Sequence, residues 1–190
     1  MLNIIIYIGM KKILLGITGA SGQIYASKMV EVVNGMGVGQ EIKLDLVFTD
    51  TAKVVWEEEL GVPVPANALD NNSYYHPYAS GSNAADVMII MPCTMGTIGR
   101  IASGATSDLL TRAADVMLKE RRPLIIVPRE TPFNLIHLRN LTTLAEAGAI
   151  IAPASPSFYT HPQDMAELID TFVRRILNIA GLEVDLKRFK

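Results

Sequence analysis

The stretch RRPLIIVPRETP, residues 121–132, is the part of the chain that best indicates its fold. The apolar and partly β-branched run 124–127 is typical of a strand buried in a parallel sheet. The run ends at Pro128, and Arg129 and Glu130 follow side by side. Ligands bind at the carboxyl ends of strands in an open α/β sheet, so this cation and carboxylate are placed to bind an anion and move a proton. The alternative is a structural salt bridge.

The same strand-then-helix pattern occurs along the whole chain. Strands are predicted at residues 13–17, 43–49, 87–91, 124–127 and 149–152. Helices are predicted at residues 23–33, 51–60, 97–103, 108–119, 134–147 and 163–179. The stretch 61–82 is rich in Pro, Asn, Ser and Tyr and indicates one long loop, and loops of that length are usually functional or disordered.

Alternating strands and helices with no repeat or linker predict a single α/β domain, with one parallel sheet covered on both faces. We place this domain at residues 11–181. Residues 1–10 are either an N-terminal extension or part of a longer first strand, and residues 182–190 form a polar C-terminal tail.

The composition narrows the function classes. Of the 190 residues, 49% are hydrophobic and only 19% charged, which favours burial of apolar surface between subunits and hence a homo-oligomer. A net charge of -2 gives no reason to expect nucleic-acid binding. A single cysteine, Cys93, excludes an intrachain disulfide and fits a reducing cytoplasm. The apolar N-terminal stretch is too short to span a bilayer, so no membrane association is expected.

The first strand leads into GITGASG, residues 16–22. Glycines let the backbone approach a ligand, a helix N-terminus attracts an anion, and Ser21 adds a hydroxyl. The spacing is neither that of a dinucleotide site nor that of a P-loop, so the motif indicates a general phosphate cradle. The alternative is a tight turn that packs a helix on a strand. Asp50, after the second strand, is either a ribose-binding acid or a helix cap.

Other candidate groups follow the later strands. Thr94 and Thr97, at a helix start, suit the oxygens of a phosphate or a flavin ring, whereas the thiol of Cys93 is expected to be buried and inert. Tyr159 follows the fifth strand and is either a phosphate ligand or a core aromatic. These positions together predict a site for one or two phosphorylated ligands.

Further cations lie on predicted helices. Arg112 and Lys119 are seven residues apart, so they share one helix face, either in solvent or around an anion site at a subunit boundary. Arg175 lies beside Arg174 in the last helix, and one of the two is expected to be a solvated charge. The three histidines show no metal spacing, so no metal site is expected.

Several motifs resemble, in order and spacing, those of the UbiX-type flavin prenyltransferases. They are GITGASG (16–22), ASGS (79–82), MPCT (91–94), DLLTRAADVMLKERRPL (108–124), VPRETP (127–132) and PSFY (156–159). The resemblance runs from about residue 11 to 179. It implies a three-layer α/β/α, Rossmann-like (flavodoxin-like) fold, assembled from trimers into a homododecamer with sites at subunit interfaces. It also implies a metal-independent transfer of a dimethylallyl group from dimethylallyl monophosphate to reduced FMN. The prenylated FMN product would serve a UbiD-type decarboxylase.

The resemblance also implies roles for particular residues. The FMN-binding set would be Gly19, Ala20, Ser21, Thr49, Thr94, Met95, Gly96, Thr97 and Arg129. The donor-binding set would be Lys119, Tyr159 and Arg175, with Arg112 and Tyr74 beside it. Ser21, Lys119 and Glu130 would be catalytic: cations and Tyr159 would stabilise the leaving phosphate, and Glu130 would exchange protons with the phosphate and then the flavin. The new bonds would form at flavin N5 and C6.

This chain departs from the family pattern at two of these positions. Many members have a lysine where Gly96 stands and a tryptophan near Tyr74, so donor details are expected to differ. Two alternative functions stay open: an FMN-dependent decarboxylase of the cysteine decarboxylase type, and a non-catalytic FMN carrier. The first would need an active-site histidine that has no match here, and the second would not need a second phosphate site.

Overall fold

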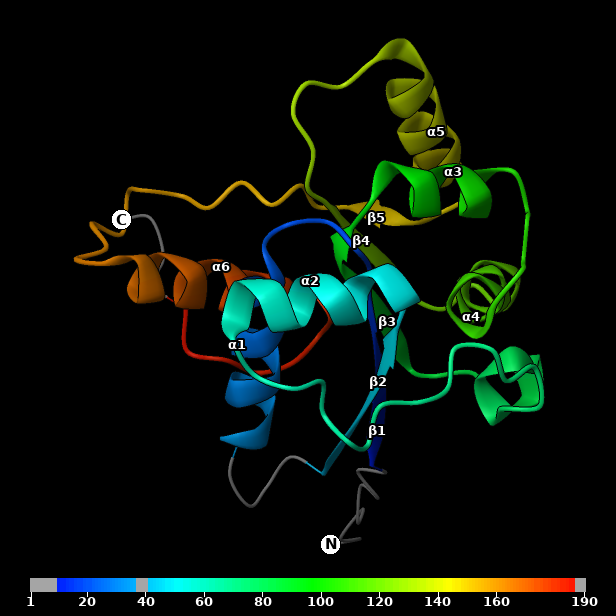
Figure 1. Cartoon of the computed structure of the whole chain (residues 1–190), viewed down its shortest axis with the longest axis horizontal. Coiled ribbons are helices and arrows are strands. Elements are labelled where there is room, and N and C mark those ends of the chain that lie inside the picture. Colours follow the sequence, from blue (N-terminus) through cyan, green and yellow to red (C-terminus); the bar gives the residue numbers. More distant parts are fainter. Residues whose placement is uncertain (1–9, 37–40, 187–190) are drawn as a thin grey trace, which may run out of the picture.

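The computed structural model describes residues 10–36 and 41–186 as one α/β unit (Figure 1). Its five strands are parallel and lie in the order β2-β1-β3-β4-β5. Their bounds are Lys11–Ile17 (β1), Ile42–Phe48 (β2), Val87–Cys93 (β3), Leu124–Pro128 (β4) and Ile150–Ile151 (β5). This strand order is that of flavodoxin-like sheets, so the predicted fold class is confirmed.

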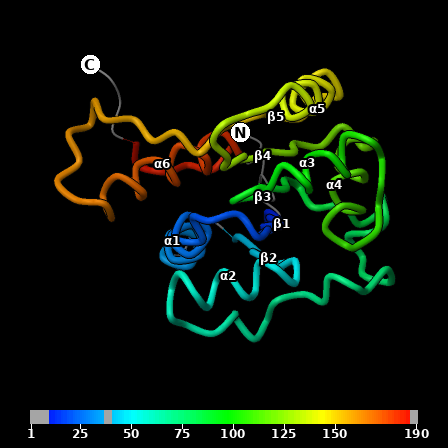
Figure 2. Tube along the Cα trace, turned by 45° about the horizontal axis from the view of Figure 1, so that its top comes forward, coloured from blue at the N-terminus to red at the C-terminus, as the bar shows by residue number. Residues whose placement is uncertain are grey.

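Helices cover both faces of the sheet (Figures 1 and 2). Their bounds are Gln23–Asn34 (α1), Asp50–Leu60 (α2), Met95–Ala102 (α3), Leu109–Lys119 (α4), Leu135–Glu146 (α5) and Met165–Ile179 (α6). Buried side chains of α1, α2 and α6 share one core cluster with the sheet, and those of α3, α4 and α5 share the other. The three predicted layers therefore follow from two separate cores.

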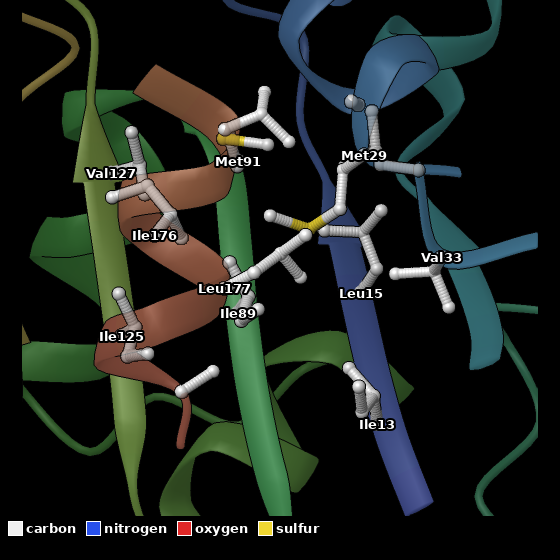
Figure 3. Packing of buried hydrophobic residues seen from close by; sticks show 14 of the residues in the cluster. Ile13, Leu15, Met29, Val33, Ile89, Met91, Ile125, Val127, Ile176 and Leu177 are labelled. Atoms are coloured by element: carbon white, nitrogen blue, oxygen red, sulfur yellow. The ribbon is translucent and has the colours of Figure 1, made fainter. Parts of the chain in front are cut away.

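Alternation along the strands supplies both cores. On β1, Ile13 and Leu15 point to the cluster under α1 and α6, while Leu14 between them points to the opposite cluster. Figure 3 shows the first cluster, where Met29 of α1 and Ile176 of α6 meet the central strands. Each fully buried Leu, Ile or Met contributes about 1.5–3 kcal/mol. Strands buried on both faces must be apolar at every position, which explains the run at 124–127.

The long loop predicted at 61–82 lies against the edge strand β2 and the helix α4. It contains two short 3-10 helices, η1 (Pro77–Ala79) and η2 (Gly81–Asn83). Leu69 forms a single parallel bridge with Val47, which covers part of the exposed edge of β2. The buried side chain of Asn71 accepts a hydrogen bond from the Leu110 amide at 2.9 Å. The loop is thus tied to both elements.

The strand order reverses between β1 and β3, and a buried hydroxyl joins the two strand ends there. Thr18 Oγ1 donates to the Pro92 carbonyl and accepts from the Thr94 amide, both at 2.8 Å. A switch point of this kind is where open α/β sheets bind ligands, because the connections leave in opposite directions. The turn after β1 and the start of α3 are held together at this point.

The two predicted ends of the domain lie partly outside the described residues. The question of an N-terminal extension or a longer first strand falls on residues 1–9, which lie outside the described residues. Residues 182–190 were predicted to be a polar tail, of which 187–190 also lie outside. Leu182 is only 3% exposed and Val184 packs against the first core, so apolar contacts continue beyond Gly181.

Candidate active site

The turn after β1 is built around the start of α1. Gly22, at the N-cap position, has φ 99°, a left-handed conformation that favours glycine, and no side chain of its own to cap the helix. Gly19 is needed for space, because a Cβ there would lie 2.5 Å from Thr51 Cγ2. Ala20 is buried and Ser21 is exposed. The predicted residues therefore form a tight turn that presents mainly Ser21 to solvent.

Glu59, from the last turn of α2, caps α1 in place of an external anion. Its carboxylate accepts from the amides of Gly22 at 2.9 Å and Gln23 at 2.8 Å, and from the hydroxyl of Ser21. Burial alone would raise the pKa of Glu59, but these hydrogen bonds and the charge of Arg129 hold it below its ordinary value. The phosphate cradle predicted here is thus occupied, in part, by the protein's own carboxylate.

Sequence reasoning missed Glu59, although a signal for it exists. The run Glu57 to Glu59 resembles a solvated acidic helix end. Ala52 and Trp56 are the buried positions of α2, and Glu59 comes three residues after Trp56 on the same stripe. The helix period therefore marks Glu59 as the acid that faces the protein.

The side chain of Gln23 supports the same turn from below. It is fully buried, and its Nε2 donates to the carbonyls of Thr18 and Ala20 at 2.8 Å each. Both carbonyls are thereby turned toward the interior. The shape of the turn is fixed by the protein before any ligand arrives.

Thr49 and Thr94 cap the two helices that start beside this turn. Thr49 Oγ1 accepts from the Ala52 amide at 3.2 Å, so the cap of α2 is Thr49, and of the two alternatives for Asp50 the helix cap is wrong. Asp50 is instead exposed and paired with Lys53 at 2.9 Å. Thr94 Oγ1 accepts from the Thr97 amide at 3.2 Å and caps α3. Both threonines lie at the sheet edge where ligand contacts were predicted.

The rest of the segment 94–97 divides into buried and open positions. Met95 packs in the second core, and Thr97 is buried with its amide bonded to Thr94 Oγ1, so neither side chain is open to a ligand. Gly96 is exposed, and a Cβ there would meet nothing within 4 Å. The space in front of α3 is therefore open at Gly96.

Arg129 and Glu130 occupy the loop after β4, as predicted. Arg129 comes near the first turn, since its Cγ would lie 4.0 Å from a Cβ placed on Gly22. Glu130 is exposed, and its carboxylate accepts from the Thr131 amide at 2.9 Å. In the described part of the chain no ion pair joins Arg129 to Glu130. The structural salt bridge considered from the sequence is not formed.

Tyr159 and Arg175 line one pocket of ≈ 740 Å³ between the loop 152–160 and α6. Arg175 donates to Asn178 Oδ1 at 3.2 Å. Arg174 lines the same pocket but is held by Asp170 at 2.6 Å. The pocket thus brings together two of the predicted donor ligands, with Arg175 exposed and Arg174 neutralised.

Arg112 and Lys119 lie elsewhere, on α4, which covers the other face of the sheet from α6. Arg112 Nε donates to the Ala79 carbonyl at 3.2 Å, and Lys119 pairs with Glu120. Lys119 lines a second pocket of ≈ 750 Å³ with Arg121 and Arg122, where α4 leads into the start of β4. Within one chain, Lys119 is therefore not brought together with Tyr159 and Arg175.

The remaining candidates have structural roles in this chain. Tyr74 donates to the Thr106 carbonyl at 2.5 Å and is half exposed. Cys93 is buried, and burial raises the pKa of its thiol. Across residues 10–36 and 41–186, no three His, Cys, Asp or Glu side chains gather to hold a metal ion. Over the same residues, no helix combines the length and apolarity needed to cross a bilayer.

Comparison with known proteins identifies the family. The Flavoprotein family model matches residues 8–177. The flavin prenyltransferase UbiX of Methanocaldococcus jannaschii is 39% identical, and the match covers 92% of this chain and 96% of that protein. AnUbiX (PadA1), solved in complex with FMN and dimethylallyl pyrophosphate, superposes with a TM-score of 0.88 at 36% identity, covering 95% of this chain and 97% of that one.

Two further solved structures differ in how much they share with this chain. The dodecameric FMN-dependent UbiX-like decarboxylase from Escherichia coli O157:H7 has a TM-score of 0.88 at 32% identity, covering 94% of this chain and 99% of that one. The FMN-dependent cysteine decarboxylase SpaF has a TM-score of only 0.56 at 21% identity, covering 77% and 85%, and so shares the fold alone. By its sequence and its structure, this chain belongs to the UbiX-type flavin prenyltransferase family of flavoproteins.

Proposed function

We propose that this protein transfers a dimethylallyl group from dimethylallyl monophosphate to reduced FMN and so makes prenylated FMN. One observation carries the proposal: Ser21, Glu59 and Arg129 meet at the switch point between β1 and β3. This is the edge of the sheet where open α/β folds bind a phosphorylated ligand. The family relation and the AnUbiX complex with FMN and a prenyl diphosphate support the same reaction.

The residues at the carboxyl edge fit a bound FMN. Ser21 and Gly96 are exposed on either side of the switch point, and the open space at Gly96 leaves room for a flat ring. The first amides of α1 are taken by Glu59, so an incoming phosphate needs another partner, and the exposed Arg129 supplies a positive charge there. The proposed FMN contacts are Gly19, Ala20, Ser21, Thr49, Thr94, Met95, Gly96, Thr97 and Arg129.

The reduced flavin supplies the nucleophile that receives the prenyl group. The protein's own part is electrostatic and acid–base. Ser21 donates to Glu59, so the Glu59 carboxylate fixes the direction of the serine hydroxyl beside the proposed flavin site. Arg175 and Tyr159 line the pocket that we assign to the donor phosphate, where positioned donors stabilise charge on the leaving group. Glu130, exposed in the loop after β4, is proposed to exchange protons with that phosphate.

The separation of the donor cations supports an assembled site. Lys119 and Arg112 lie on the opposite face of the sheet from Arg175, so they reach a donor phosphate only from a neighbouring copy. Leu135 and Ile136 of α5 are 59% and 66% exposed, as expected for contacts between subunits. We propose a homododecamer with sites at subunit interfaces, as the dodecameric relative suggests by analogy.

The compartment and the downstream partner follow from the chemistry. A reducing cytoplasm suits a protein that consumes a reduced flavin and carries a single cysteine. A UbiD-type decarboxylase is the proposed recipient of prenylated FMN, and transfer of that product to a purified decarboxylase tests this step.

The reaction itself is tested by anaerobic incubation with reduced FMN and dimethylallyl monophosphate, followed by mass spectrometry of the released flavin. A gain of one C5H8 unit is the expected result. Glu130→Gln should still bind FMN but lose turnover, which separates an enzyme from a carrier. Unmodified FMN released from folded, flavin-bound wild-type protein would contradict the proposal for this donor.

A further inference from the structure

A buried tyrosine ties the loop 61–82 to the edge of the sheet. Tyr78, in η1, is 4% exposed, and its hydroxyl donates to Asp45 Oδ2 at 2.5 Å. Asp45 lies on the edge strand β2, and the same oxygen pairs with Lys43 Nζ at 2.7 Å. The hydrogen bond therefore joins two segments 33 residues apart. It lies away from the Ser21 turn.

The segment that Tyr78 anchors is pressed against the two cations of α4. The carbonyl of Ala79, the next residue, accepts from Arg112 Nε at 3.2 Å. On its other side the Arg112 guanidinium is paired with Asp115 at 2.7 Å. A Cβ placed on Gly81 would lie 2.7 Å from Lys119 Nζ, so η2 touches the second cation. In Figure 1 the η1–η2 segment lies beside α4.

The ring and the hydroxyl of Tyr78 have separable roles. The ring packs in the second core cluster and lies 5.0 Å from the ring of His76, and a phenylalanine would keep these contacts. The hydroxyl supplies the hydrogen bond to Asp45 on β2. Burial and the neighbouring carboxylate of Asp45 raise the pKa of Tyr78, so the hydroxyl stays a donor at neutral pH. A buried hydroxyl is stable only with a partner, so the bond selects one placement of the segment.

We infer that the Asp45–Tyr78 hydrogen bond positions residues 77–83 and, through them, the donor-phosphate cations Arg112 and Lys119. Asp45 and Tyr78 are positioning residues, because neither touches the proposed ligands. Arg112 has one carbonyl and one carboxylate to fix its guanidinium, and the carbonyl moves with η1. A shift of η1 therefore misplaces the charge that the donor phosphate meets. The inference rests on the proposed function, since it assigns these cations to the donor.

The test compares Tyr78→Phe with the full-length wild-type protein. At saturating reduced FMN, KM for dimethylallyl monophosphate should rise about fivefold to tenfold, less than for the loss of a charged contact, because the cations are shifted and not removed. The dissociation constant for FMN should stay unchanged. Asp45→Ala, which removes the acceptor, should have the same effect, and the double variant should be no worse than either single one, because both remove one interaction. Tyr75→Phe removes a hydroxyl from a fully exposed neighbour and should change nothing.

A second measurement does not depend on turnover. Hydrogen–deuterium exchange across residues 77–83 should become faster in Tyr78→Phe and in Asp45→Ala but not in Tyr75→Phe. Unchanged exchange, an unchanged KM, or equal losses of donor and FMN affinity would overturn the inference. If Tyr78→Phe does not fold, Asp45→Ala carries the same two measurements. A wild-type protein without prenyl transfer would overturn the proposed function, and the positioning of residues 77–83 would then be decided by exchange alone.

Discussion

Replacing Glu59 by Gln tests the internal cap of α1 quantitatively. Glutamine keeps one acceptor oxygen for the Gly22 and Gln23 amides but removes the negative charge from the helix N-terminus. Loss of the charge–dipole interaction costs about 0.3–1 kcal/mol, and a neutral hydrogen bond is weaker than a charged one by about 1 kcal/mol. The two effects add to about 1.3–2 kcal/mol. Because Glu59 is exposed to solvent, screening reduces them, and we expect a loss of about 1–1.5 kcal/mol in the free energy of unfolding.

The expected loss depends on pH in a defined direction. The folded-state pKa of Glu59 lies below its ordinary value of 4.5, so the ionised carboxylate stabilises the fold above that pH. As the pH falls below 4.5 and through the lowered value, the carboxylate becomes protonated and this stabilisation disappears. The difference between wild type and Glu59→Gln should therefore be full at pH 7 and shrink in acid.

Urea unfolding and thermal melts of the two proteins measure this difference, with Glu58→Gln as the matched control on the same helix turn. At pH 7 the melting temperature of Glu59→Gln should be lower than that of wild type by roughly 2–6 °C for a domain of this size. A Glu59→Gln variant as stable as Glu58→Gln at pH 7 would refute the capping role. So would a difference that persists undiminished at pH values of about 3, below the ordinary pKa of a glutamate in the unfolded chain.

Three other changes have expected outcomes. Arg175→Ala should raise KM for dimethylallyl monophosphate by roughly 10- to 100-fold, the range for losing a charged hydrogen bond, with FMN affinity unchanged; loss of both affinities would argue against separate donor and flavin sites. Asp108→Ala should destabilise the fold by about 2–4 kcal/mol in urea titrations, because this buried residue caps α4 and pairs with Arg100 at 2.7 Å; a loss under about 0.5 kcal/mol would be inconsistent with that burial. Cys93 should not react with an aromatic disulfide reagent in the folded protein and should react once the protein is unfolded in urea, because its thiol is buried with a raised pKa; rapid labelling of the native protein would contradict this.

The helices and strands could be predicted because their hydrophobic patterns are local. The errors lie at helix ends, where a capping side chain determines the first residue of the helix. The helix predicted from residue 97 begins at Met95, because Thr94 caps it two residues before the apolar pattern becomes clear. The last helix begins at Met165 for the same reason, since Asp164 accepts from the Glu167 amide at 2.8 Å. The strand predicted at 149–152 pairs only at Ile150–Ile151, as expected for a short edge strand.

The site was less predictable, because spacing along a helix does not say which edge of the sheet a residue reaches. Arg112 and Lys119 share a face, as their spacing predicts, but seven residues of helix span about 10 Å. Lys119 thus lies near the start of β4, whereas Arg129 follows its end. Glu59 was missed because its partners, Ser21 to Gln23, lie more than 35 residues away. Neither relation can be read from a local pattern.

The hydroxyl of Thr18 has a mechanical consequence for flavin binding. It bonds the Pro92 carbonyl and the Thr94 amide at the point where β1 and β3 part, so one buried side chain joins the two strand ends beside the proposed flavin site. Without it, the two turns would keep the backbone bond from the Thr18 amide to the Pro92 carbonyl at 3.3 Å but lose the link to Thr94. With the Thr18 hydroxyl in place, the two turns form one rigid edge. A ligand that contacts both turns therefore needs no rearrangement of one relative to the other. The flavin should therefore bind to a preformed surface, without a loop closing over it at this point.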